Sequence, residues 1–333
     1  MFVLMVLGAV LLLFAVLGGG LALFWRSKRK KILRRTGIAY LVVVPIILLG
    51  VGPFWMARFV TRAGTRPPDM RLKDTPADSG VPFEAVQFQA TDGVTLSGWW
   101  IAPTQENVVV LLSHGLFRNR IEMLSRAMAL AKAGYGALLY DSRNHGTSQK
   151  GVVSLGFYEA QDVLGGMAYI RSRTGTSAAA PAKIVLMGVS MGAVATLRAA
   201  SESNGYAALI LDSPFASIRE TIADHAWLFF KLPRFTFPPI FLFWFQRFAG
   251  FDVDQVDSHT AMTRVQPVPL LMISSQGDRR MRPEVARQLF EESRSPVKKI
   301  EIFGQDAGHG AAARLHPDQY AALIVGFLDK TLP

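Results

Sequence analysis

From residue 84 onward, short runs of apolar residues alternate with longer stretches in which apolar residues recur at helical spacing. The short runs in the interior of this region are almost continuous Val, Leu and Ile, which is typical of strands that are buried on both faces of a parallel sheet. The predicted strands are 85–89, 96–101, 108–113, 137–141, 184–188, 209–212, 270–274 and 299–303. The predicted helices are 119–133, 157–173, 191–203, 283–293 and 315–330.

This alternation predicts an α/β fold with a mostly parallel central sheet and helices on both faces. Thr91-Asp92-Gly93 joins the first two strands and is typical of a hairpin turn, so we expect the sheet to open with an antiparallel pair. One insert, residues 215–266, breaks the alternation and contains a proline-interrupted stretch dense in Phe and Trp, 227–251. We expect a cap over the carboxyl edge of the sheet, whose aromatic residues either line a groove or form the cap's own core.

The region before residue 84 has a different pattern. Residues 2–25 and 38–57 carry no charge, and each run is about as long as the 20 residues that a membrane-spanning helix needs. The segment between them, 26–35, holds seven basic residues and no acid. We therefore predict a transmembrane helical hairpin in an anchor of residues 1–61, a linker over 62–83, and the α/β domain over 84–333, with its cap at about 215–266.

The basic segment also predicts the orientation of the hairpin, because short loops rich in Lys and Arg stay in the cytoplasm. The α/β domain would then lie on the extracytoplasmic side of the cell inner membrane. A second, sparser basic group follows residue 57 and weakens this assignment. Three alternatives remain open: a cleaved signal peptide, two buried core helices, and a single span whose second run lies in the membrane interface with the domain in the cytoplasm.

The distribution of charge changes how the basic composition is interpreted. The net charge is +11, but residues 1–75 hold twelve basic and two acidic residues, so the rest of the chain is close to neutral. A nearly neutral domain lacks the basic surface that binding to a nucleic acid requires, and we expect no nucleic-acid partner. The chain has no Cys, which excludes disulfides, thiolate nucleophiles and Cys-ligated zinc.

The clearest catalytic motif is Gly188-Val189-Ser190-Met191-Gly192, between a predicted strand and a predicted helix. A serine on such a tight turn needs small flanking residues, and the turn lifts its hydroxyl above the sheet edge. Ser190 is therefore the predicted nucleophile. The other interpretation is a glycine-flanked turn in which the serine merely caps a helix.

A serine nucleophile needs a base, and the base needs an acid that orients it. Asp278 directly follows the strand 270–274, and His309 follows the last strand, which is the order Ser, acid, His expected for this arrangement. Asp212, at the end of another strand, and Asp306 are rival acids. Backbone amides of Leu116 and Met191 are the predicted oxyanion hole.

The remaining histidines have structural interpretations. We expect His114 and His145 to fix loops, and we place His225 and His259 in the cap and His316 at a helix start. None of them has the spacing of zinc ligands on one helix, so we predict neither a metal nor a cofactor.

Five motifs in the expected order carry a family resemblance: His-Gly at 114–115, Asp-Ser-Arg-Asn-His-Gly at 141–146, Gly-Val-Ser-Met-Gly at 188–192, Gly-Asp at 277–278 and Gly-His-Gly at 308–310. Through them, residues 84–330 resemble the α/β-hydrolase superfamily, most of all its serine-aminopeptidase-like and acyl-hydrolase branches. The resemblance implies an α/β-hydrolase fold with a Ser-His-Asp triad. It does not extend to residues 1–75, and Asn144 stands where family members often carry Gly.

The reaction that we expect is acyl transfer to water, with an ester as the first choice of substrate, as in a carboxylesterase or lipase. A lipophilic acyl group suits an aromatic cap beside a membrane anchor, and the lipid bilayer is the other expected partner. A thioesterase or a peptidase is the alternative within enzymes, and Asp252, Asp254 and Asp257 are candidates for holding a peptide's amine. Outside enzymes, the alternatives are a catalytically silent membrane scaffold and a lipid-binding or transport partner.

Overall fold

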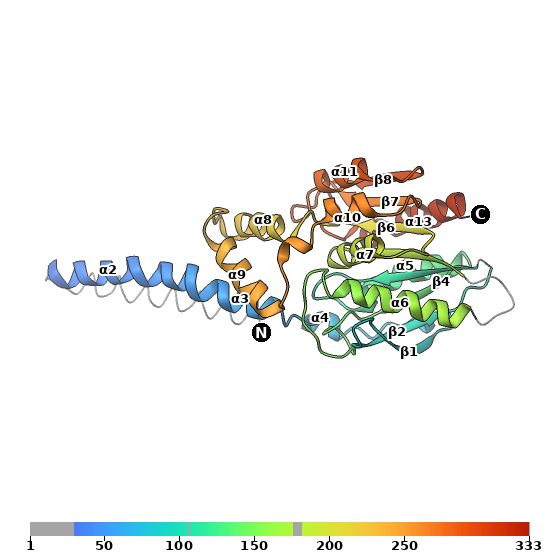
Figure 1. The fold of residues 1–333 in the computed structure, drawn as a ribbon, viewed down its shortest axis with the longest axis horizontal. Helices are drawn as coiled ribbons and strands as arrows, with labels where there is room; N and C mark the ends of the chain where they lie inside the picture. Colours follow the sequence, from blue (N-terminus) through green and yellow to red (C-terminus); the bar gives the residue numbers. More distant parts are fainter. Residues whose placement is uncertain (1–29, 106, 176–181, 333) are drawn as a thin grey trace.

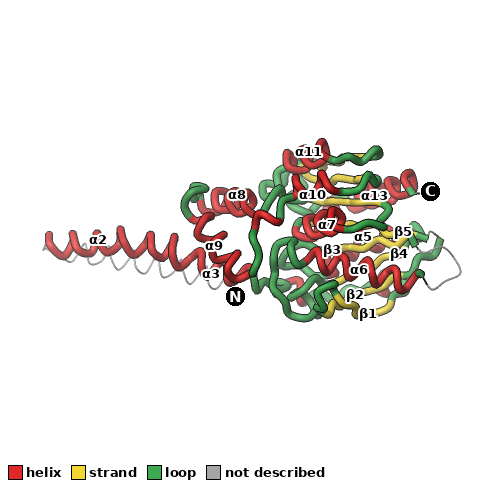
Figure 2. The backbone as a smooth tube through the Cα atoms, viewed as in Figure 1, coloured by secondary structure: helices red, strands yellow, loops and turns green. Residues whose placement is uncertain are grey.

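Eight strands form one mostly parallel sheet at the centre of the molecule (Figures 1 and 2). The computed structural model describes residues 30–105, 107–175 and 182–332. The strand order is β1-β2-β4-β3-β5-β6-β7-β8, and only the β1–β2 and β2–β4 pairs are antiparallel. The strands are β1 (Glu84–Gln89), β2 (Thr95–Ile101), β3 (Val108–Ser113), β4 (Gly136–Tyr140), β5 (Lys183–Val189), β6 (Ala208–Asp212), β7 (Leu270–Ser275) and β8 (Lys298–Phe303). All eight predicted strands are confirmed, as is the antiparallel opening of the sheet.

Helices cover both faces of the sheet, as predicted. One face packs against α6 (Glu159–Thr174), α7 (Met191–Glu202) and α11 (Pro283–Glu292). The other packs against α5 (Leu124–Lys132), α12 (Ala312–Leu315) and α13 (Pro317–Thr331), and the short helix η3 (Arg120–Met123) leads into α5. Strand β3 shows why its sequence is an unbroken apolar run: alternate residues enter the two cores, Val109 and Leu111 on one face and Val110 and Leu112 on the other.

The insert between β6 and β7 contains α8 (Ile218–Phe230), α9 (Phe237–Ala249), η4 (Val253–Gln255) and α10 (Ser258–Arg264). Helices α8 and α9 form the cap, and prolines at the first positions of α9 start that helix. The predicted cap extended to residue 266, whereas α10 packs against α7 and α11 on the body of the domain. The physical reason is that α10 buries Met262 in the core beside the sheet, so only the first part of the insert stands over the sheet edge.

The segment before β1 is mostly helical. Helix α2 (Lys30–Pro45), the π-helix η1 (Ile46–Val51) and α3 (Gly52–Val60) follow one another, and Figure 1 shows α2 extending away from the sheet while α3 lies beside α9. Pro45 lies where α2 gives way to the π-helix, because a proline removes a helical hydrogen bond. By length and composition, Gly37–Val60 is a candidate membrane span of 24 residues, and only 6% of its most apolar window is buried.

The run 2–25 lies outside the described residues, so the hairpin predicted from it stays a prediction. The basic segment 26–35 was expected to be a loop, but from Lys30 onward it belongs to α2. Lys and Arg are good helix formers, and nothing in residues 30–35 ends a helix.

Residues 62–83, expected to be a linker, carry two short helices, α4 (Pro67–Met70) and η2 (Pro76–Ser79). The segment is attached to the α/β domain, because Asp69 is buried and accepts hydrogen bonds from Arg118. Each short helix begins with a proline, which suits the first turn because its missing N–H has no helical partner there. Two of the prolines in this segment therefore mark the first residues of short helices.

Candidate functional site

Ser190 lies at the sharp turn between β5 and α7, with a backbone φ of 55°. This left-handed conformation is unusual for a residue with a side chain and stores strain at the turn. A Cβ at Gly188 would overlap the carbonyl oxygen of Gly192, and a Cβ at Gly192 would overlap the carbonyl oxygen of Ser113. The two glycines of the motif are therefore required by close backbone approach.

The structure brings Ser190, His309 and Asp278 into one hydrogen-bonded relay. The Ser190 Oγ lies 2.8 Å from Nε2 of His309, and Nδ1 of His309 lies 2.7 Å from Oδ2 of Asp278. With Asp278 ionised, the serine hydroxyl donates to Nε2 and the Nδ1–H donates to the carboxylate. The three side chains come from loops after β5, β7 and β8, which end at the same edge of the sheet.

Asp278 is fixed by its second oxygen. The backbone amides of Arg280 and Met281 both donate to Oδ1, each at 2.9 Å. The side chain is buried, so these two donors compensate the carboxylate for the water that it loses. The orientation of Oδ2 toward His309 follows from this arrangement.

The rival acids have other partners. Asp212 is buried and accepts hydrogen bonds from Arg126 at 3.0 Å and from the hydroxyl of Tyr320 at 2.8 Å, so its carboxylate is engaged in a structural ion pair. Asp306 is exposed, and its Oδ2 lies 2.8 Å from Nε2 of His316. Neither carboxylate contacts His309 in the described part of the chain.

The loop after β3 lies directly beside the nucleophile. A Cβ at Gly115 would lie 3.5 Å from the Cβ of Ser190, and Leu116 and Met191 line the same cavity as Ser190. Neither the Leu116 nor the Met191 amide has another hydrogen-bond partner among the described residues. Both predicted oxyanion residues therefore lie beside the Ser190 hydroxyl, and their roles stay predictions.

Glu122 holds this loop, and the sequence reasoning missed it. Its Oε2 accepts a hydrogen bond from the Gly115 amide at 2.7 Å, and its Oε1 lies 3.2 Å from Nε of Arg118. Burial raises the pKa of the Glu122 carboxyl, and the Gly115 amide and Arg126 oppose that rise. A signal existed in the sequence: Asn119 three residues before Glu122 has the spacing of a capping box. Asn119 does cap η3, but Glu122 bonds Gly115 instead.

His114 and His145 fix loops, as predicted. His114 is fully buried, with Nδ1 at 2.8 Å from the Gly115 carbonyl and Nε2 accepting from the Ser142 amide. Nε2 of His145 accepts from the Phe117 amide at 3.3 Å. Burial lowers the pKa of both imidazoles, that of His145 to about 4, so both are neutral at pH 7.

The other histidines are distributed over the cap and the domain. His225, on α8, lines the cavity beside Ser190, and its Nδ1 bonds the Thr221 carbonyl. His259 contacts Glu292, on the body of the domain. No cluster of three or more metal-ligating side chains occurs within the described ranges.

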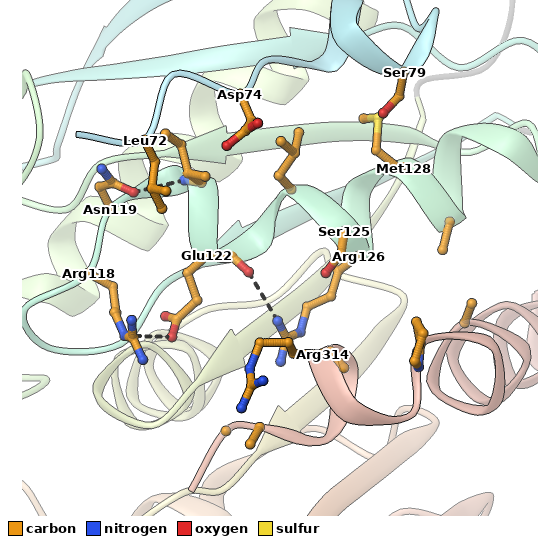
Figure 3. Close-up of a pocket in the computed structure, with 18 of the residues that line it drawn as sticks. Leu72, Asp74, Ser79, Arg118, Asn119, Glu122, Ser125, Arg126, Met128 and Arg314 are labelled. Carbon is orange, nitrogen blue, oxygen red and sulfur yellow. Dashed lines mark hydrogen bonds and ion pairs between the residues drawn. The ribbon is translucent and has the colours of Figure 1, made fainter. Parts of the chain in front are cut away.

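Two cavities meet at the relay. The first, of about 450 Å³, contains Ser190 and is enclosed almost entirely by apolar side chains of the cap, of the loop after β3 and of α3. That volume falls in the range of small-molecule sites. The second, of about 1350 Å³, reaches His309 and is lined by Glu122, Arg126 and Arg314 (Figure 3). His309 thus lines the polar cavity, while Ser190, to which it is hydrogen-bonded, lines the apolar one.

The wall formed by α3 was not anticipated. Met56, Phe59 and Val60 line the apolar cavity, although they belong to the helix predicted as part of the anchor. Their spacing of three and four residues places them on one helix face. The acids proposed for an amine, Asp252, Asp254 and Asp257, cap short helices or pair with Arg219, and none of them lines the cavity that contains Ser190.

Residues 104–242 match a protein family described as serine aminopeptidase, S33. The chain is 26% identical to the uncharacterized protein YqkD of Bacillus subtilis over 90% of this chain and 98% of that protein, and 26% identical to the uncharacterized protein YfhR of Escherichia coli K12 over 75% and 81%. Among solved structures, the Pyrococcus furiosus esterase Pf2001 superposes with a TM-score of 0.66 at 24% identity, covering 81% of this chain and 98% of the esterase. An acylaminoacyl peptidase of Pyrococcus horikoshii superposes with a TM-score of 0.56 at 19% identity, over 78% of this chain and 44% of the peptidase. These structural likenesses concern the fold.

Proposed function

We propose that this chain, which has the α/β-hydrolase fold and matches a serine aminopeptidase family over residues 104–242, is a membrane-anchored serine hydrolase that cleaves carboxylic esters. The observation that carries the proposal is the relay of Ser190, His309 and Asp278, with hydrogen-bonding distances of 2.8 and 2.7 Å. The apolar cavity beside the serine supports an ester with a lipophilic acyl group as the substrate.

In the proposed first step, His309 takes the proton of Ser190 while the serine oxygen bonds to the ester carbonyl carbon. The carbonyl oxygen becomes an oxyanion that accepts hydrogen bonds from the Leu116 and Met191 amides. Collapse of this intermediate breaks the bond to the leaving alcohol, which receives the proton from His309. Asp278 orients the imidazole and stabilises its charged form.

In the second step, His309 removes a proton from water, and the resulting hydroxide attacks the acyl-serine. The bond to Ser190 breaks, the serine recovers its proton, and the carboxylic acid leaves. Because His309 lines the polar cavity and Ser190 the apolar one, we propose that the alcohol departs through the polar side and the acyl chain occupies the apolar side.

A fluorophosphonate probe and p-nitrophenyl esters test this function. The full chain in detergent should be labelled and should turn over the esters, whereas Ser190→Ala should lose labelling and about 10⁴- to 10⁶-fold in kcat. Wild-type protein that is neither labelled nor active would refute the enzyme and favour a scaffold or a lipid carrier.

A matched panel of esters, thioesters and amides separates the ester hydrolase from the alternatives within enzymes. The family description and one structural neighbour name peptidases, so a peptidase remains the second candidate. Asp252, Asp254 and Asp257 do not line the serine cavity, which supports the ester as the first choice. A higher kcat/KM for aminoacyl amides than for esters would reverse that order.

We further propose that Gly37–Val60 spans the inner membrane and that the catalytic domain faces the extracytoplasmic side. The absence of Cys makes this testable, because a single introduced thiol is then unique. A Ser79→Cys variant in intact cells should react with a membrane-impermeant maleimide, since Ser79 is exposed on the domain surface. Reaction only after lysis would place the domain in the cytoplasm.

A further inference from the structure

One wall of the cavity beside Ser190 is built by α3, the last part of the apolar N-terminal helix. Met56, Phe59 and Val60 of α3 face the same space as Ser190 and Met191. Cap residues such as Phe237 and Phe241 form much of the rest of the enclosure. The chamber for a lipophilic group is therefore closed jointly by the cap and by the proposed membrane anchor.

Helix α3 is held in a fixed position against the catalytic domain. Ala57, on α3, is fully buried, and Phe54 packs edge-on against Trp244 and Phe248 of α9 with ring centroids 4.9 and 5.2 Å apart. Contacts of this kind stabilise both helices through burial of aromatic surface. The wall is therefore packed firmly against the cap.

The chain that follows α3 is also tied to the loops around the active site. The Arg66 amide donates to the carbonyl of Phe117 at 2.9 Å, and Asn144 donates to the carbonyl of Ala63 at 2.6 Å. Asn144 has a φ of 65°, a conformation that Asn tolerates better than most residues, and its amide supplies a contact that a glycine lacks. The residue that departs from the family pattern thus links the anchor to the domain.

Upstream, the same helix runs into the candidate span Gly37–Val60, whose side chains are largely exposed. Met56, Phe59 and Val60 are among the last five residues of that span, so they lie at its domain end. A helix that crosses a bilayer with this end at the surface would bring the cavity wall to the level of the lipid headgroups.

Helices α8 and α9 lie on the side of the domain from which α2 leaves (Figure 1), and large apolar side chains of this cap are exposed. Phe235, in the turn between α8 and α9, is 82% exposed, and Phe243 on α9 is 60% exposed. Lys231 and Arg234 precede Phe235 in the same turn. Aromatic side chains interleaved with basic ones are typical of surfaces that lie in the membrane interface.

We propose that this protein takes its substrate directly from the bilayer: the exposed face of the cap rests on the lipid surface next to the span, and the acyl chain of a membrane-held ester enters the cavity between the cap and α3. The inference rests on the proposed hydrolase function and names the substrate class for that site. The partner that contacts the exposed surface of the cap is the lipid bilayer, because the proposed membrane span Gly37–Val60 lies next to this surface and continues into the bilayer. The bond that breaks is the ester bond of the proposed mechanism.

The first test fills the cavity from α3. In the full chain in detergent, Val60→Trp should lower kcat/KM for p-nitrophenyl laurate at least tenfold relative to p-nitrophenyl acetate. Val51→Trp is the matched control, because Val51 is exposed on the same helical segment and does not line the cavity. If Val60→Trp fails to fold, Met56→Ala tests the same wall in the opposite direction. This variant enlarges the cavity, so it should raise the ratio of kcat/KM for p-nitrophenyl laurate to that for p-nitrophenyl acetate.

Labelling of Ser190 by the fluorophosphonate probe keeps the two failures apart. Wild type that is not labelled refutes the hydrolase itself. Labelled variants whose laurate-to-acetate ratio equals that of wild type refute only the role of α3, and with it the proposed route of the substrate.

The second test concerns the bilayer. With the chain in phosphatidylcholine vesicles, Phe235→Ser combined with Phe243→Ser should slow hydrolysis of a long-chain fluorogenic ester held in the same vesicles at least threefold. Hydrolysis of p-nitrophenyl acetate in detergent should stay within twofold of wild type. Val297→Ser is the control, because Val297 is 49% exposed just before β8, at the opposite end of the sheet. Equal rates on the vesicle-held ester for wild type and the double variant would overturn contact between the cap and the bilayer.

Discussion

Replacing Asp278 by Asn removes the acceptor for the Nδ1–H of His309 while leaving the size of the side chain almost unchanged. The structure determines which way the new amide would point. Oδ1 of Asp278 receives two backbone N–H groups, from Arg280 and Met281, and an NH₂ group in that place would face two donors. The amide oxygen therefore keeps the Oδ1 position, and the NH₂ group is directed at His309.

The consequence for His309 is a change of tautomer. Its Nδ1 must then accept a hydrogen bond, so the proton moves to Nε2, the atom that lies 2.8 Å from Ser190 Oγ. An Nε2–H cannot take the serine proton, and the general base is lost. Loss of the orienting acid in such a triad lowers kcat by about 10⁴, or about 5 kcal/mol in the barrier.

The assay is kcat with p-nitrophenyl butyrate, accompanied by the melting temperature of each variant in the same detergent. Asp306→Asn is the control for the acid assignment, since Asp306 is exposed and contacts His316 instead of the relay. We expect Asp306→Asn to remain within a few-fold of wild type. An Asp278→Asn variant that is folded and retains more than a tenth of wild-type kcat would refute the tautomer argument.

Two further predictions concern stability. Arg126→Met should lower the free energy of unfolding by about 3–5 kcal/mol in a urea titration, because it removes the ion-pair partner of the buried Asp212 carboxylate. Arg219→Met breaks the exposed ion pair with Asp254 and should lower the free energy of unfolding by less than about 1 kcal/mol. Equal losses in the two variants would contradict this prediction. Burial lowers the pKa of His145 to about 4, so between about pH 6.5 and pH 4 the unfolded chain binds a proton that the folded chain does not. The free energy of unfolding should therefore fall by up to about 3 kcal/mol as the pH drops from about 6.5 to 4. His145→Asn should remove this share of the pH dependence, and an unchanged dependence would show that His145 is not responsible.

Much of the fold was predictable because burial leaves a strong signal in the sequence. A strand such as β3 enters two cores at once, and its unbroken apolar run records that environment. The relay was predictable for a related reason. Ser190 needs glycines two residues away on either side, and Asp278 and His309 each follow a strand closely.

The parts that were missed depend on contacts between distant segments. The Pro-rich composition of 62–83 suggests a connection with no structure, yet its role is decided by hydrogen bonds to loops more than 45 residues away, such as Arg118 to Asp69 and Asn144 to Ala63. Glu122 was missed because its partner is the Gly115 backbone amide, which no side-chain pattern reveals. The role of α3 in the cavity was missed because an apolar helix face is expected both in a membrane-spanning helix and in a helix that lines an apolar cavity.

The position of the cap in the chain has a consequence for how such a protein can diversify. Its helices α8 and α9 are inserted between β6 and β7, whereas the three relay residues follow β5, β7 and β8. Lengthening or rewriting the stretch from Ile218 to Ala249 therefore alters the roof of the chamber without shifting any strand that carries the chemistry. Selectivity and reactivity are thus separable traits in this architecture, and new preferences can arise by drift in one peripheral segment while the machinery beneath it stays intact.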